Sequence, residues 1–71
     1  MPILIFKTNI RFKKDLKKIE PILNGINDVV KWNVDRSDID KVLRIEARTN
    51  NLEQIIDSIQ QEGYLCEELP D

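Results

Sequence analysis

The chain has 71 residues and a mass of 8.4 kDa, enough for one domain over residues 1–71 with a small core. A domain of about 60 residues buries only about 60% of the surface that its unfolded chain exposes, so a deep enzyme-sized cleft is hard to accommodate. Charged residues make up 34% of the chain, hydrophobic residues make up 41%, and the formal net charge is -2. This composition is typical of a globular protein, and it gives no global electrostatic reason to expect nucleic acid as a partner.

The chain contains one cysteine, Cys66, and no histidine. A single thiol cannot form an intrachain disulfide, which excludes a disulfide-stapled secreted module. Without histidine, the usual general base and the commonest metal ligand are missing. The apolar run at residues 3–6 is too short for a signal peptide, and no stretch approaches the roughly 20 apolar residues of a membrane span. We therefore expect a cytoplasmic protein without a membrane partner.

The first part of the chain predicts a strand followed by a helix. Residues 3–6 are continuously apolar, which indicates a strand that is central in a sheet or covered on both faces. Pro21 lacks the amide hydrogen that a helix interior needs, so we expect a kink or a break near Glu20. Gly25 is expected to end the helix in a left-handed conformation. The apolar residues of this helix recur at spacings of four and three, and they are Phe12, Leu16, Ile19, Leu23 and Ile26.

The middle of the chain predicts a hairpin of two half-buried strands. Val30, Trp32 and Val34 alternate with polar residues over residues 29–35, and a similar alternation follows over residues 43–48. The polar segment "DRSDID" connects the two. The alternate polar residues are expected on an open sheet face, and they are Lys31, Asn33, Asp35, Arg44, Glu46 and Arg48.

The last part predicts a second helix and a short final strand. Asn51 is a suitable N-cap, with Gln54 placed to complete a capping box. Gly63 is expected to end the helix, residues 64–69 to form the strand, and Pro70 to stop it. The apolar stripe of the helix consists of Leu52, Ile55, Ile56 and Ile59.

The order of these elements predicts a fold. A β-α-β-β-α-β sequence with amphipathic helices and strands indicates the α+β ferredoxin-like sandwich, in which two helices cover one face of a four-stranded antiparallel sheet. Right-handed crossovers place the first strand beside the third, which gives the strand order 4-1-3-2.

Three motifs in this frame resemble one family. "LNGI" at residues 23–26, "VKWNVD" at residues 30–35 and "EGY" at residues 62–64 stand in the order and spacing of motifs in the heavy-metal-associated domains. These domains are small copper and zinc chaperones and the amino-terminal modules of metal-pumping ATPases. The resemblance covers essentially the whole chain, and it implies a ferredoxin-like fold with a metal-binding loop after the first strand.

The chain departs from the family at that loop. The family pattern is Met-Thr-Cys-x-x-Cys, whereas this chain has "KTNIRF" at residues 7–12, with Asn9 and Phe12 at the positions of the two cysteines. Copper(I) selects thiolate or thioether ligands, and zinc prefers thiolate, imidazole and carboxylate. An amide oxygen and a benzene ring do not replace them. The sequence therefore predicts no metal site of the family type and no cofactor.

Cys66 is the only weak candidate ligand that remains. It is expected to be a small, partly buried residue of the last strand. Alternatively, Cys66 binds copper or zinc in a two-coordinate thiolate site across a homodimer, or together with a partner's ligands. Tyr64 corresponds to a family tyrosine that lies over the metal loop. Without the cysteines, we expect its ring to pack at the edge of the loop and its hydroxyl to stay in water.

A group of cations near the loop is the candidate partner-binding surface. It is either the solvated face of the first helix or a docking surface, because family chaperones use a lysine-rich patch to meet an acidic patch on a target domain. The second interpretation implies a protein partner with an acidic surface. The candidate residues are Lys7, Arg11, Lys13, Lys14, Lys17 and Lys18, together with Tyr64. The acidic residues at the other end of the chain are Glu62, Glu67, Glu68 and Asp71.

Other functions find less support in the sequence. "DRSDID" lacks the glycine and the alternating oxygens of a calcium loop, so a hairpin turn is expected. The open sheet face has no aromatic residues to stack RNA bases. The edge strand at residues 29–35 could pair with a second copy, although Lys31 opposes this. No catalytic constellation is visible. We therefore expect a non-catalytic protein-interaction module, with metal trafficking through Cys66 as the alternative.

Overall fold

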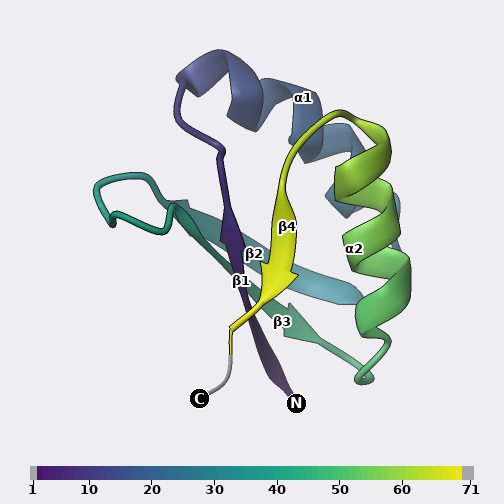
Figure 1. The fold of residues 1–71 in the computed structure, drawn as a ribbon. Coiled ribbons are helices and arrows are strands. Elements are labelled where there is room, and N and C mark those ends of the chain that lie inside the picture. The colour runs from purple at the N-terminus through teal and green to yellow at the C-terminus, as the bar shows by residue number, and fades with distance from the viewer. Residues whose placement is uncertain (1, 70–71) are drawn as a thin grey trace.

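The computed structural model describes residues 2–69. Its elements are β1 (Ile3–Thr8), α1 (Lys13–Asn24), β2 (Val29–Asp35), β3 (Val42–Ala47), α2 (Leu52–Gln61) and β4 (Cys66–Glu68). The strands form one antiparallel sheet in the order β2-β3-β1-β4, and both helices cover the same face of it (Figure 1). The predicted ferredoxin-like sandwich and its strand order are confirmed. β4 is shorter than expected, and Pro70 lies outside the described residues.

β1 lies in the middle of the sheet, between β3 and β4. Its burial alternates: Leu4 and Phe6 are buried beneath the helices, whereas Ile3 on the other face is 51% exposed. The prediction of a central strand is confirmed, but one face of the strand remains open.

No helix within residues 2–69 has the length and apolar character needed to cross a membrane.

The core lies between the sheet and the helices, and one of its members differs from the prediction. Phe12 was expected on the apolar face of α1, but it precedes the helix with an extended backbone (φ -107°, ψ 156°), and it is 58% exposed. Ile10, from the loop, is fully buried instead. The buried apolar residues are Leu4, Phe6, Ile10, Ile19, Leu23, Ile26, Leu43, Ile45, Ala47, Ile55, Ile59 and Cys66.

The helix ends also show where local rules hold and where they fail. α1 continues through Pro21 to Asn24, so the expected break does not occur. Gly25 has a right-handed backbone (φ -84°, ψ -7°), not a left-handed one, because its N–H donates to the Pro21 and Ile22 carbonyls at 3.1 and 3.3 Å and continues the helical turn. Gly63, after α2, has a φ of 96°, which is the expected left-handed termination.

The start of α2 has the expected N-cap residue without the expected bonds. Asn51 occupies the N-cap position, but its side chain makes no hydrogen bond to the helix backbone. Its Nδ2 donates instead to Oε1 of Gln54 at 3.1 Å, so the two side chains bond to each other and no capping box forms.

A β-bulge changes which residues of β2 face the core. Val29 pairs with Ala47 and Lys31 pairs with Glu46, which leaves Val30 as the extra residue, 43% exposed. The prediction that Val30 points inward is therefore wrong, and Val29 packs against the core in its place. Trp32 and Val34 pack inward as expected, and Nε1 of Trp32 donates to Oδ1 of Asn24 at 3.1 Å.

Candidate functional site

Three loops meet where β1 ends: residues 9–12, 36–41 and 62–65, here called the three-loop end (Figure 1). The backbone N–H of Thr8 donates to the Asp40 carbonyl at 3.0 Å, and the Thr8 hydroxyl donates to the Lys41 carbonyl. The backbone N–H of Leu65 donates to Oδ1 of Asn9 at 2.9 Å. Thr8 and Asn9 thus connect the first loop to both of the others.

Asn9 and Phe12, where the motif resemblance predicts the family cysteines, carry one hydrogen-bonded and one exposed side chain. The amide oxygen of Asn9 accepts the Leu65 bond just described, and the Phe12 ring lies in solvent with the Lys14 ammonium 5.5 Å from its centre. Neither group is a ligand for a soft metal. Among residues 2–69, no group of three or more histidine, cysteine, aspartate or glutamate side chains is placed to hold a metal ion.

Asp15 organises the first loop, and the sequence reasoning missed it. Its Oδ2 accepts the Phe12 N–H at 2.9 Å and the Arg11 N–H at 3.3 Å, while its Oδ1 accepts the Tyr64 hydroxyl at 2.7 Å. The bonds from Phe12 and Tyr64 contribute most to holding the pKa of the Asp15 carboxyl below its ordinary value of 3.8. An acidic residue three positions after a helix N-cap is the available sequence signal for this role.

Tyr64 is half-buried and its hydroxyl is not left in water as expected, because it donates to Asp15. Burial, followed by the hydrogen bond to the Asp15 carboxylate, raises the pKa of Tyr64 to about 12. The contact joins the loop after α2 to the start of α1 across 49 positions of the chain. The ring packs against the hydrophobic core.

Cys66 lies on β4 and is 1% exposed. Its side chain belongs to the core, and burial raises the pKa of its thiol to about 12. The thiolate is the form that binds metals, so a buried thiol that stays protonated is a poor ligand. A second chain could reach it only if this part of the core opened.

The predicted basic residues lie around the three-loop end and along α1. Lys7 is half-buried with its Nζ 4.0 Å from Oδ1 of Asp40, while the cations from Arg11 to Lys18 are exposed. Two further cations, Arg36 and Lys41, come to the same place from the β2–β3 loop. Four cations thus line one hollow at the three-loop end. Its lining residues are Lys7, Thr8, Asn9, Arg11, Arg36, Ile39 and Lys41. Sequence reasoning missed Arg36 and Lys41, although the predicted hairpin and strand order already return their loop to the end of β1.

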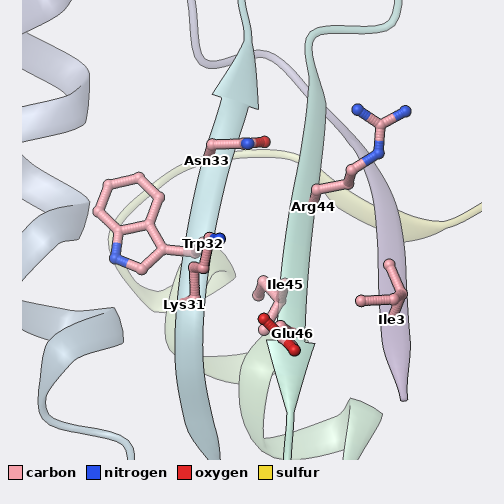
Figure 2. Close-up of a pocket in the computed structure, with 7 residues that line it drawn as sticks. All are labelled: Ile3, Lys31, Trp32, Asn33, Arg44, Ile45 and Glu46. Carbon is pink, nitrogen blue, oxygen red and sulfur yellow. The ribbon is translucent and has the colours of Figure 1, made fainter. Parts of the chain in front are cut away.

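The open face of the sheet carries a second, smaller hollow of about 170 Å³. Figure 2 shows its lining side chains on β1, β2 and β3, with Trp32 projecting from β2 toward the helix side. Lys31 pairs with Glu46 across the strands, and Arg44 pairs with the neutral Asn33, so the lining contains charges of both signs. This face therefore does not present a field of one sign.

Comparisons with known proteins show a shared fold without close sequence relatives. The yeast copper transporter domain Ccc2a, solved in apo and Cu(I)-loaded states, matches with a TM-score of 0.80 and 17% identity over 97% of this chain and 96% of that one. The N-terminal domain of ZntA in its Zn(II) form matches with a TM-score of 0.79 and 16% identity over 93% and 89%. A chain of the Atx1–Cu(I)–Ccc2a complex matches at 0.80 and 17% over 97% and 96%.

The chain has the fold of a heavy-metal-associated domain. No protein-family model matches the sequence, and a search of curated proteins finds no significant match. The heavy-metal-associated-like fold that the three motifs imply is thus supported by structure. At 14% to 17% identity, it is the fold alone that is shared.

Proposed function

We propose that this domain is a non-catalytic protein-interaction module in which the metal loop of the family has become a structural loop. The observation that carries the proposal is the hydrogen bond from the Leu65 N–H to Asn9, at a position where the family has a metal-binding cysteine. The Asp15–Tyr64 bond fixes the same loop from its other side. With both bonds in place, protein groups hold the loop to the segment before β4, and we expect the loop to be ordered without a metal.

The proposed interaction surface is the basic side of the molecule. All 11 lysines and arginines lie within residues 1–48, and residues 49–71 contain acidic residues but no cation. The exposed side chains from Arg11 to Lys18 therefore favour a protein partner with an acidic surface, since complementary charges raise association rates and orient the partners. That a structural neighbour was solved in the Atx1–Cu(I)–Ccc2a complex supports a protein as the partner. The single free cysteine is the reason to place the domain in the cytoplasm.

The second candidate function is copper or zinc binding through Cys66, in a homodimer or with a partner's ligands. It is favoured by the neighbours that were solved with Cu(I) and Zn(II). The 1% exposure of Cys66 weighs against it, because the thiol would have to leave the core to bind.

A metal titration separates the two candidates. Wild-type protein under reducing conditions is titrated with copper(I) or zinc against a competing chelator, and Cys66→Ala is the matched variant. We expect both proteins to leave the metal with the chelator. Tight binding by the wild type that disappears in Cys66→Ala would replace the proposed function with the metal-binding one.

A second titration tests the surface itself. Polyglutamate added to the wild type is expected to shift backbone amide signals within residues 7–18, and charge reversal at either Lys13 or Lys17 alone is expected to weaken binding. Lys31→Glu, on the exposed part of β2, is the control with the same change of charge. If the control weakens binding equally, the interaction reflects net charge and not this surface.

A further inference from the structure

The hollow at the three-loop end carries charge of one sign. Lys7, Arg11, Arg36 and Lys41 line it, from β1 and from two loops that are far apart in the sequence, and none of the lining residues is acidic. Cations gathered from separate segments around a concave surface focus a positive potential there. This differs from the row of lysines along α1, which projects from one helix face into open solvent.

Three aspartates, Asp35, Asp38 and Asp40, bring negative charge close to these cations, but two of them form bonds within their own turn. Oδ1 of Asp35 accepts the N–H and the hydroxyl of Ser37 at 3.2 and 2.8 Å, and Oδ1 of Asp38 accepts the N–H of Asp40 at 2.8 Å. These are local turn-forming bonds. Within residues 2–69, the single ion pair at 4.0 Å or less joins Lys7 to Asp40. The guanidinium groups of Arg11 and Arg36 are thus open to an anionic partner.

Apolar side chains accompany these cations. Ile39, which lines the hollow, is 92% exposed. Phe12 in the first loop and Leu65 in the third are 58% and 39% exposed, so three of the five large exposed hydrophobic residues within residues 2–69 come from the three-loop end. Exposed apolar groups beside arginines are typical of protein interfaces, whereas a small inorganic anion makes no use of them.

We propose that the hollow binds an acidic protein segment that carries an apolar side chain. Carboxylates of the segment meet Arg11 and Arg36, and its apolar side chain packs on Ile39. This inference rests on the proposed function and adds the β2–β3 loop to the docking surface. The lysines of α1 attract any acidic surface. Arg36 and Ile39 of the β2–β3 loop bind only a surface with a carboxylate and an apolar side chain in matching positions, so this loop would determine partner specificity.

A peptide titration tests the proposal. The probe is a short peptide of alternating glutamate and leucine, compared with peptides in which glutamine replaces glutamate or serine replaces leucine. Amide shifts are expected at residues 7–11 and 36–41, with weaker binding of both comparison peptides. Arg36→Gln is expected to reduce affinity about two- to fivefold, and Ile39→Ser about five- to tenfold. Lys31→Gln and Val30→Ser are matched controls at exposed positions of β2, and they are expected to leave affinity unchanged.

The possible contradictions point to different conclusions. Peptide shifts confined to residues 13–18, with unchanged affinity in Arg36→Gln and Ile39→Ser, would overturn this inference and leave the proposed function standing. Absence of binding to any peptide would overturn both. Self-association of the chain without peptide, lost in Arg36→Gln, would assign the hollow to a second copy and overturn the acidic-segment proposal.

Discussion

Asp15 and Tyr64 form the polar contact that holds the first and third loops together. The carboxylate is 7% exposed and accepts three hydrogen bonds, two from backbone amides and one from the phenol. Such bonds favour the ionised carboxylate and the neutral phenol, which is why the pKa of Asp15 falls while that of Tyr64 rises. Tyr64, which resembles the tyrosine of the family's metal loop, thus stabilises this loop through its hydrogen bond to Asp15.

Removing the Asp15 charge is expected to lower the pKa of Tyr64. In Asp15→Asn, the pKa should fall from about 12 toward 10.0, and the part caused by burial should remain. Tyr64 is the only tyrosine, so the ultraviolet absorbance of its phenolate reports this value directly. Because the folded pKa is raised, the stability that Tyr64 contributes is present below pH 10.0 and is lost as pH rises toward 12; this loss should be smaller in the variant.

Asp57→Asn, at an exposed position of α2, is the control for this measurement. An unchanged Tyr64 pKa in Asp15→Asn, with the protein still folded, would contradict the contact between the two side chains.

At the scale of elements, α1 contains a proline, Pro21, which disfavours a helical conformation. Pro21 lies inside Lys13–Asn24, where it cannot donate to the Lys17 carbonyl. The helix continues because Ile19 and Leu23, on either side of Pro21, are fully buried against the sheet and α2. Burial of two such side chains contributes about 3–6 kcal/mol, enough to outweigh the roughly 3 kcal/mol cost of an interior proline.

Pro21→Ala is expected to raise the free energy of unfolding by about 1–2 kcal/mol. The change restores a helix hydrogen bond, and the greater freedom of the unfolded chain offsets about 0.4–1 kcal/mol of the gain. Pro21 is exposed, so no cavity results. Chemical denaturation measures the effect, with Glu20→Ala as an exposed neighbouring control that should stay within about 0.5 kcal/mol. A destabilised Pro21→Ala would show that the proline ring itself contributes packing that the burial pattern does not indicate.

At the scale of the whole molecule, the fold is separable from the metal site. This chain shares its architecture with domains solved with Cu(I) and Zn(II), at TM-scores of 0.79 to 0.80, yet it has neither cysteine of the family loop. The sheet and helices are stabilised by the burial of apolar side chains between them. Function in such a fold depends on the few side chains that its loops present.

Restoring the two thiols is therefore expected to create a metal site on this scaffold. Asn9→Cys combined with Phe12→Cys should bind copper(I) or zinc in competition with a chelator, since thiolates supply the soft ligands that the loop lacks. Phe12 is exposed, and loss of the Asn9–Leu65 bond costs about 1 kcal/mol, so the variant should fold. Serine at both positions is the matched control. A folded double-cysteine variant that binds no metal would show that the loop backbone no longer permits the site.

Some features of this protein can be predicted from the local sequence pattern, and others depend on the tertiary structure. Apolar periodicity and turn residues predict the element order, the strand order and most of the core, because burial of one face constrains each helix and strand separately. They also place Asn9 and Phe12 where the family has its cysteines. The residue types at those two positions supply no thiolate, so a bis-thiolate site is not expected there.

Other features depend on contacts between distant segments, which no local pattern contains. The bulge at Val30 and the burial of Ile10 in place of Phe12 follow from how β2 pairs with β3 and how α1 packs on the sheet. The Asp15–Tyr64 bond and the meeting of Arg36 with Arg11 require the three loops to come together. The strand order of the open sheet brings those loops to one end, so the proposed docking surface is a property of the folded chain.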